Sequence, residues 1–216
     1  EILVWGRWEP NSYTTKWRFA KVKADDAKDG VINIDLSQPN PQIPDKIEVV
    51  FIPTPKDVVA GMCKLAKIGK EDIVYDLGCG DGRMVLQAVA DFNAKLGVGV
   101  DLDPKLVAQC KKTAETMGIA ERVEFRQGDV LDIKDLSRAN VVLLYMGEDI
   151  NLRLKPILQK TLKPGSRVVS HAFGMGDWKP NKTVVVDSEE QGNCPLYLWI
   201  IGEEAKEEPQ VKDAPK

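Results

Sequence analysis

The sequence predicts an α/β fold: a Rossmann-like, doubly wound sheet of seven strands, mostly parallel, with an antiparallel closing pair and a small N-terminal β extension. Apolar, strand-like runs alternate with helix-like segments at intervals of roughly 25 residues, which is typical of βαβ units. One such run, residues 73–77, passes through three glycines into a helix-like stretch, residues 84–90. A strand, a glycine turn and a helix in this order are typical of a corner that binds a nucleotide-like ligand.

Prolines, glycines and apolar periodicity define the other elements of this domain. A helix is expected over residues 55–68, with Pro55 in its first turn, Thr54 as its cap and Gly69 at its end. Two further helices are expected over 104–117 and 150–162. The expected parallel strands are 97–101, 123–129, 139–145 and 167–170, and the antiparallel pair is 182–186 with 196–201.

Residues 1–48 differ in composition from the rest and are expected to form an aromatic-rich β extension, with strands over 2–8, 16–23 and 31–36. The tryptophans among its first twenty residues need a surface on which to be buried. The extension therefore either covers a hydrophobic edge of the main domain or serves as an aromatic lid or a dimer surface. The main domain is expected over 49–202, and the charged residues 203–216 are expected to be a disordered tail.

The composition argues against some classes of function. A net charge of −3 gives no electrostatic case for nucleic acid or an anionic membrane as a partner. No apolar run approaches the ~20 residues of a membrane-spanning helix. The four cysteines are scattered, so we expect reduced thiols, with neither a disulfide framework nor a metal site. The chain starts at Glu1 without Met, and we expect a cytoplasmic protein, with a cleaved leader as the alternative; the oligomeric state is not indicated.

The spacing of the glycines narrows the choice of ligand. The turn has the pattern Gly-x-Gly-x-Gly at positions 78, 80 and 82, and Arg83 stands where a dinucleotide site needs its third glycine. A cofactor without a pyrophosphate fits such a turn better than NAD does, which favours S-adenosylmethionine, with S-adenosylhomocysteine as its product. The turn residues Gly78, Cys79, Gly80 and Asp81 are expected to contact this cofactor.

Acidic residues at successive strand ends support the same cofactor, because the carboxyl ends of parallel strands meet at one edge of the sheet. Asp101 lies 21 positions after Gly80, where a carboxylate accepts hydrogen bonds from vicinal ribose hydroxyls, and Leu102 follows it to pack on the base. Asp129 and the N–H of Val130 are expected to bind the adenine ring. Asp76 is expected to pair with the ammonium of the cofactor's amino-acid end, and Thr54 is a candidate contact for its carboxylate as well as a helix cap.

The segment after the fourth parallel strand bears on the methyl acceptor. It reads Leu143-Leu144-Tyr145-Met146-Gly147 and contains neither the Asn/Asp-Pro-Pro-Tyr/Phe motif of base-amine methyltransferases nor a Pro-Cys nucleophile. Together with the acidic net charge, this argues against nucleic acid as the acceptor.

Four segments carry a family resemblance: Pro53–Val59, Asp72–Arg83, Leu162–Phe173 and Trp178–Pro180. They resemble the small archaeal and bacterial broad-specificity protein-lysine methyltransferases. More distantly, they are similar to the mitochondrial enzymes that methylate lysine on the ATP synthase c subunit and on the adenine nucleotide translocase. The resemblance implies the seven-strand S-adenosylmethionine methyltransferase fold and a protein substrate that presents lysine.

A lysine acceptor must lose a proton before it attacks, because only the neutral amine has a lone pair. An apolar channel lowers the pKa of the amine, and Tyr145 and Trp178 are candidates for its walls, with the Tyr145 hydroxyl orienting the nitrogen. His171, the only histidine, is either a general base or a residue that holds this edge of the sheet through the backbone. Trp178 is equally a candidate for ordinary packing.

The sequence therefore predicts an S-adenosylmethionine-dependent N-methyltransferase that acts on lysine side chains of proteins. One alternative is a small-molecule methyltransferase whose specificity residues 1–48 determine. Another, of a different class, is a cofactor-binding interaction protein without catalytic activity.

Overall fold

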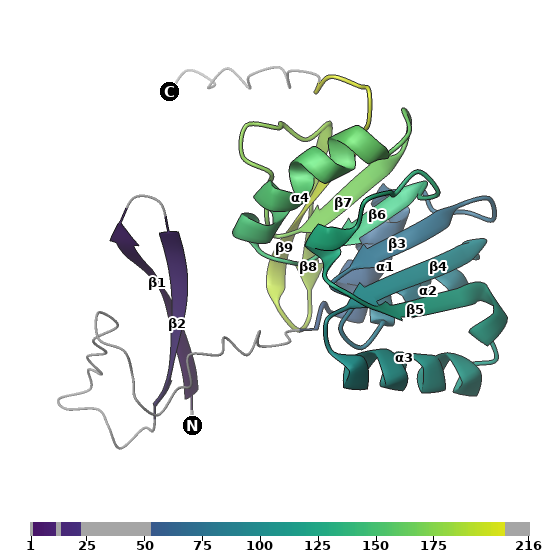
Figure 1. Ribbon diagram of the computed structural model, residues 1–216, viewed down its shortest axis with the longest axis horizontal. Coiled ribbons are helices and arrows are strands. Elements are labelled where there is room, and N and C mark those ends of the chain that lie inside the picture. The colour runs from purple at the N-terminus through teal and green to yellow at the C-terminus, as the bar shows by residue number, and fades with distance from the viewer. Residues whose placement is uncertain (1, 12–13, 23–52, 206–216) are drawn as a thin grey trace, which may run out of the picture. The chain divides into compact units, whose positions relative to one another are not determined.

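Seven strands form one mixed sheet in the order β5-β4-β3-β6-β7-β9-β8 (Figure 1). The first five strands in this order are parallel, whereas β9 is antiparallel to both of its neighbours, β7 and β8. The predicted fold class and the closing antiparallel pair are therefore confirmed. The strands are β3 (Ile73–Leu77), β4 (Leu96–Asp101), β5 (Val123–Gln127), β6 (Val141–Leu144), β7 (Arg167–His171), β8 (Lys182–Ser188) and β9 (Gly192–Ile200).

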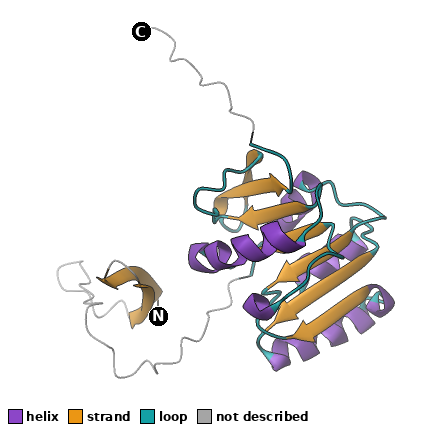
Figure 2. Cartoon of the chain, turned by 45° about the horizontal axis from the view of Figure 1, so that its top comes forward, coloured by secondary structure: helices purple, strands orange, loops and turns teal. Residues whose placement is uncertain are grey.

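Helices cover both faces of this sheet, as Figure 2 shows. One face packs against α1 (Lys56–Leu65), α2 (Arg83–Ala90) and α3 (Pro104–Thr116), and the other packs against α4 (Glu148–Thr161). The central strand β6 is buried along its whole length, as expected for a strand with both faces covered. We refer to the edge at which β3 to β7 end as the carboxyl edge.

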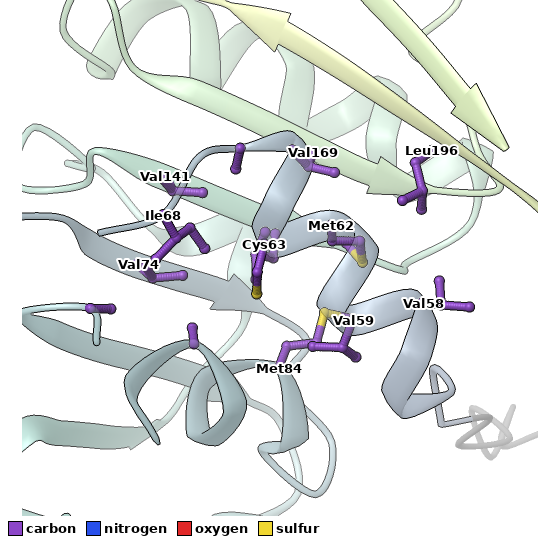
Figure 3. Packing of buried hydrophobic residues seen from close by; sticks show 14 of the residues in the cluster. Val58, Val59, Met62, Cys63, Ile68, Val74, Met84, Val141, Val169 and Leu196 are labelled. Atoms are coloured by element: carbon purple, nitrogen blue, oxygen red, sulfur yellow. The ribbon is translucent and has the colours of Figure 1, made fainter. Parts of the chain in front are cut away.

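Helix α1 lies across the centre of the sheet and connects strands that are distant in the sequence. Its buried side chains Val58, Met62 and Cys63 point toward the sheet, where Val169 of β7 and Leu196 of β9 belong to the same apolar cluster (Figure 3). Because α1 packs on both parallel and antiparallel strands, its first turn is held in a fixed place above the carboxyl edge.

Several details differ from those predicted; strand β9, for example, begins at Gly192 and not at residue 196, and β8 ends at Ser188. Helix α1 ends at Leu65 and not at residue 68, because Lys67, and not the predicted Gly69, takes the left-handed conformation that ends the helix. The N-cap of α1 is Pro55 and no side chain caps it, so the predicted cap role of Thr54 is wrong. Strand β5 stops at Gln127, two residues before Asp129, which caps a single 3₁₀ turn.

The computed structural model describes residues 2–11, 14–22 and 53–205. The chain divides into two units, residues 1–50 and 51–216, which are described separately. In the first, β1 (Ile2–Asn11) pairs antiparallel with β2 (Thr14–Val22), which confirms two expected strands. The strand expected over 31–36, and most of the expected tail, lie outside the described residues. Among the described helices, none combines the length and apolar character needed to cross a membrane.

Substitution of Gly97 tests how closely α2 packs on β4. A Cβ atom at Gly97 would lie 2.4 Å from Val85 Cγ1 and 3.0 Å from Val89 Cγ2. The Gly97→Ala variant is therefore expected to lose about 1–3 kcal/mol of unfolding free energy, measured by urea denaturation. Gly69→Ala is the matched control, since a Cβ at Gly69 meets nothing within 4 Å. Equal stability of the two variants would contradict this packing.

Candidate active site

A glycine turn joins β3 to α2 at the carboxyl edge. Gly78, Gly80 and Gly82 all have positive φ, at 83°, 54° and 78°, which favours residues without a Cβ. The N–H groups of Gly78 and Cys79 donate to the carbonyl oxygen of Val100 at 2.9 and 3.0 Å. A Cβ at Gly78 would lie 1.9 Å from Met146 Sδ, so the loop after β6 approaches the turn closely. The turn is thus held between the ends of β4 and β6.

Arg83 holds the turn against the start of α1. Its guanidinium forms a bidentate ion pair with Asp81, with N–O distances between 2.6 and 3.0 Å. Its Nη1 also donates to the carbonyl oxygen of Thr54 at 3.0 Å. The hydroxyl of Thr54 is buried and has no hydrogen-bond partner among the described residues. Arg83 therefore connects the glycine turn to a residue that carries a free buried hydroxyl.

Asp76 is a buried carboxylate without a partner. It is 1% exposed, and neither of its oxygens accepts a hydrogen bond from the described residues. Burial, followed by the charges of Asp101 and Asp81, raises the pKa of Asp76 to about 8. An unpaired buried carboxylate is strongly destabilising unless a cation or donor meets it. The site therefore has a place for a positively charged group beside the glycine turn.

Asp101 ends β4 and is fixed by two backbone groups. Its Oδ2 accepts from the N–H of Gly80 at 2.8 Å, and its Oδ1 accepts from the N–H of Asp103 at 2.9 Å. A carboxylate has about four acceptor positions, so two remain for a ligand. Leu102 follows with 63% of its surface exposed, so its side chain is available to a ligand. The pair thus offers acceptors and an apolar surface to one ligand.

Asp129 lies one strand further along the edge. Its Oδ1 accepts from the N–H of Leu131 at 2.8 Å, which orders the 3₁₀ turn that contains the buried Val130. Asp76, Asp101 and Asp129 thus stand at the ends of three adjacent parallel strands, as the sequence predicted.

Three aromatic rings stack at the ends of β6 and β7, which lie on the other side of β3 from β4 and β5. The ring of Tyr145 stacks on His171, with centroids 4.2 Å apart, and on Phe173, at 5.8 Å. We call Tyr145, His171 and Phe173 the aromatic layer. Cross-strand register and strand alternation place Asp76, Tyr145 and His171 on the same face of the sheet, the face that α1 covers.

Burial keeps the aromatic layer uncharged. It lowers the pKa of His171 to about 4, and it also raises the pKa of Tyr145 above its ordinary value. His171 is 2% exposed, and its Nδ1 has no hydrogen-bond partner among the described residues. The imidazole is therefore neutral at physiological pH, and its Nδ1 does not hold the edge through a backbone hydrogen bond.

The structure does not bring Trp178 to Tyr145. Trp178 packs on Trp199, with ring centroids 5.7 Å apart, and its carbonyl oxygen accepts from Trp199 Nε1 at 2.8 Å. Trp199 belongs to the apolar cluster beneath α4, whereas Tyr145 packs on the cluster beneath α1. The two residues predicted as walls of one channel thus lie in different clusters, and Phe173 is the aromatic residue that accompanies Tyr145.

All four cysteines are free and buried. Cys110 Sγ donates to the carbonyl oxygen of Gly80 at 3.3 Å, beneath the glycine turn. A hydrogen bond with Cys110, together with burial, raises the pKa of Cys79, and burial raises the pKa of Cys63 to about 12. The four thiols are free, as expected, and all of them belong to apolar clusters: Cys79 and Cys110 to the one beneath the glycine turn, Cys63 and Cys194 to the one beneath α1.

Sequence reasoning missed three residues: Arg83, Phe173 and Asn151. Arg83 is next but one to Asp81, a spacing that allows the ion pair but does not require it. Asn151 is fully buried in α4, in line with Leu154 and Leu158. A polar residue in the apolar stripe of a helix is a signal that could have identified it.

Comparison with known proteins identifies the family. A family model described as ANTKMT methyltransferase domain matches residues 76–182. A protein-lysine N-methyltransferase of Saccharolobus islandicus is 41% identical over 155 residues, which are 72% of this chain and 95% of that protein. The chain therefore belongs to the family of this protein-lysine N-methyltransferase. The family model and this relative together confirm the resemblance found in the sequence.

Two other methyltransferases are similar to this chain, and one of them was solved with the product of the cofactor. An RNA methyltransferase from Salinibacter ruber, solved in complex with S-adenosyl-L-homocysteine, is 46% identical with a TM-score of 0.65, covering 73% of this chain and 98% of its own. The mouse adenine nucleotide translocase lysine N-methyltransferase is 27% identical over 64% of this chain and 59% of its own length. The chain is therefore an S-adenosylmethionine-dependent methyltransferase, as the sequence predicted.

The raised pKa of Asp76 predicts a pH-dependent stability of the cofactor-free protein. The folded-state pKa of about 8 lies above the ordinary value of 3.8, so protonated Asp76 contributes stability that is fully present below pH 4. This contribution is lost as the pH rises from 4 to 8, at up to about 1.4 kcal/mol per pH unit. The Asp76→Asn variant does not ionise and should lack this loss.

Urea denaturation of the cofactor-free proteins between pH 4 and 9 measures the difference. We expect the Asp76→Asn variant to gain stability relative to the wild type up to pH 8 and to keep a constant advantage above it. Glu121→Gln, at an exposed position, is the control. A stability difference that does not change with pH would contradict the buried, unpaired state of Asp76.

Proposed function

We propose that this methyltransferase transfers the methyl group to the ε-amino nitrogen of lysine in protein substrates. The observation that carries the proposal is the 41% identity to an archaeal protein-lysine N-methyltransferase over 95% of that protein's length. The match spans 155 of the 216 residues, which is 72% of this chain.

The unpaired groups beside the glycine turn fit the amino-acid end of S-adenosylmethionine. The ammonium of the cofactor is a cation that Asp76 would bind, which would lower the pKa of this carboxyl and remove the cost of its burial. The free hydroxyl of Thr54 is a donor for the cofactor's carboxylate. Arg83 orients Thr54 through its carbonyl oxygen and fixes Asp81 at the same time. Gly78, Cys79 and Gly80 let the backbone approach the cofactor closely.

The adenosine end of the cofactor fits the next two strands. Asp101 has acceptor positions for the two ribose hydroxyls, and the exposed side chain of Leu102 would cover one face of the adenine. Asp129 and the N–H of Val130 would bind the polar edge of the ring. Each of these residues stands at or just after the end of its strand, so the cofactor would lie along the carboxyl edge.

On the acceptor side, the chain's own residues position an amine and exclude water. When bound, the cofactor supplies an electrophilic methyl carbon on a sulfonium. A lysine ammonium would have to give its proton to water, since His171, with a pKa of about 4, is a weak acceptor at neutral pH. The aromatic layer favours the neutral amine because it carries no charge and admits little water. Tyr145 keeps its hydroxyl proton and can orient the nitrogen lone pair toward the methyl carbon.

The charge of the surface around the site supports a protein acceptor over RNA. Glu148 and Asp149 are exposed in the first turn of α4, directly after the loop that carries Tyr145. Glu189 and Glu190 are exposed in the turn between β8 and β9, which Asp57 ties to the start of α1. These carboxylates would repel a polyanion and attract a lysine-rich protein surface.

Labelled methyl transfer in a cell lysate tests the acceptor. We expect label from S-adenosylmethionine to enter macromolecules, to survive ribonuclease and to be lost on proteolysis, with mass spectrometry locating it on lysine ε-nitrogens. Label that is lost on ribonuclease treatment, or that enters only small molecules, would overturn the proposal.

Two pairs of glutamates test the electrostatic part of this argument. Replacing Glu189 and Glu190 by Gln should lower kcat/KM several-fold on a basic protein, and less at high salt, because it removes attraction near the site. Replacing Glu203 and Glu204 by Gln is the matched control, since both are exposed and follow β9 at the opposite edge of the sheet. Equal effects of the two double variants would contradict steering at the carboxyl edge.

Asp101 tests the cofactor assignment separately from the acceptor. The Asp101→Ala variant should bind S-adenosylhomocysteine at least ~10-fold more weakly in calorimetry, because hydrogen bonds to a carboxylate are lost. Asp103→Ala is the control: it removes the N-cap of α3, a loss of about 1 kcal/mol of stability, without touching the ribose acceptors. Unchanged affinity in the Asp101→Ala variant would refute the ribose contact.

A further inference from the structure

Asn151 connects helix α4 to the segment that follows β7. Its side chain is 0% exposed, and its Nδ2 lies 3.0 Å from Ser170 Oγ. The same Nδ2 lies 3.2 Å from the carbonyl oxygen of Phe173 and 3.3 Å from that of Gly174. A buried amide nitrogen that faces three oxygens fixes the position of the backbone it touches, because leaving those carbonyls unpaired is costly.

The backbone between His171 and Gly174 makes a tight and unfavourable turn. Ala172 has φ of 63°, a conformation that non-glycine residues rarely adopt. The N–H of Phe173 donates to the carbonyl oxygen of His171 at 2.8 Å, which closes the turn over a single residue. Such a conformation persists only where the surroundings hold it in place, and Asn151 supplies hydrogen bonds to its far side.

This turn sets the aromatic layer. It begins at His171 and includes Phe173, and both rings stack on Tyr145. We propose that Asn151 is a positioning residue for methyl transfer, which holds the turn His171–Gly174 and thereby fixes the aromatic layer against which the acceptor amine is placed. The effect on methyl transfer rests on the proposed function, whereas the effect on the turn does not.

Asn151 acts through the backbone, since it lies on the other face of the sheet from the layer. Its helix neighbours Leu154 and Leu158 pack in the cluster beneath α4, and Tyr145 packs in the cluster beneath α1. A change at Asn151 therefore alters the layer only by moving the turn. The glycine turn and the three strand-end carboxylates make none of the hydrogen bonds of Asn151, so cofactor binding should be insensitive to the change.

The single histidine gives a readout that does not depend on the acceptor. His171 is the only histidine of the chain, so its imidazole signals in the NMR spectrum of untagged protein are unambiguous. With the turn held, we expect His171 to titrate near pH 4. In the Asn151→Leu variant the turn should loosen, and the titration should move toward the ordinary value of about 6.5.

Kinetics should change in a matching way. The Asn151→Leu variant is expected to lose about 10- to 100-fold in kcat, because the acceptor is misplaced, while its Kd for S-adenosylhomocysteine stays within about twofold of the wild type. Ser166→Ala is the matched control: Ser166 is buried just before the other end of β7 and donates to the carbonyl oxygen of Ala139 at 3.2 Å. It should lose stability and change neither kcat nor the His171 titration.

Variants at Ala172 test the same turn with Asn151 intact. Ala172→Val should reproduce the loss of kcat and the shift of the His171 titration, since a β-branched residue tolerates this φ poorly. Ala172→Gly in the Asn151→Leu background should restore part of both, because glycine takes the conformation without strain. The Ala172→Val result also covers the case in which Asn151→Leu does not fold.

The outcomes separate the two proposals. A wild-type kcat and an unshifted His171 titration in a folded Asn151→Leu variant would overturn the positioning role, as would the same result for Ala172→Val if Asn151→Leu does not fold. A loss of cofactor affinity equal to the loss of kcat would overturn it as well. If lysine methylation itself is not observed, the titration of His171 still decides whether Asn151 holds the turn.

Discussion

The charge state of one buried carboxyl group, that of Asp76, constrains this structure. Asp76 ends up inside the protein because it belongs to a central strand, yet the described residues offer it no partner. The glycine turn that follows Asp76 is held by hydrogen bonds to the carbonyl oxygen of Val100, near the end of β4. Such an arrangement is stable only if the group is protonated or meets a cation. A protein that binds a cationic cofactor can tolerate this arrangement, because the ligand completes what the fold leaves open.

The two halves of the site are held in different ways. On the cofactor side, backbone hydrogen bonds to Val100 and Asp101 and the ion pair of Arg83 fix the glycine turn. On the acceptor side, the site is held by the stacked rings and by the strained turn at Ala172, to which Asn151 of α4 donates hydrogen bonds. The first half is built to bind a charged ligand. The second is apolar and neutral, as placement of an uncharged nucleophile requires.

The fold and the positions of the strand-end carboxylates can be predicted from the sequence, because they follow from periodicity and topology. Parallel strands bring their carboxyl ends together, so the sequence alone places Asp76, Asp101 and Asp129 on one edge of the sheet. Contacts between distant segments could not be predicted in this way. The predicted pairing of Trp178 with Tyr145 is wrong because no local rule says which face of the sheet a loop aromatic residue covers. Thr54 does not cap α1, because Pro55 is the N-cap residue. The hydroxyl of Thr54 therefore has no hydrogen-bond partner among the described residues.

Asn151 shows that a residue can be noticed in the sequence while its partners cannot be predicted. Its place in an apolar stripe was visible, but its partners, Ser170 and the carbonyl oxygens of the turn, lie about twenty residues away in the sequence. Only the packing of α4 on β7 brings them together. Candidate cofactor-binding residues at strand ends are therefore easier to predict from a sequence than the residues that hold a site in position.

The buried cysteines have a practical consequence. All four native thiols are shielded from solvent, and the pKa of Cys63 and that of Cys79 are raised, so thiolate forms are scarce at neutral pH. A cysteine introduced at an exposed position would thus react with a maleimide dye well before the native ones. Fluorescent labels could be attached without first removing any natural thiol, and the approach of an acceptor protein to the carboxyl edge could be followed one molecule at a time.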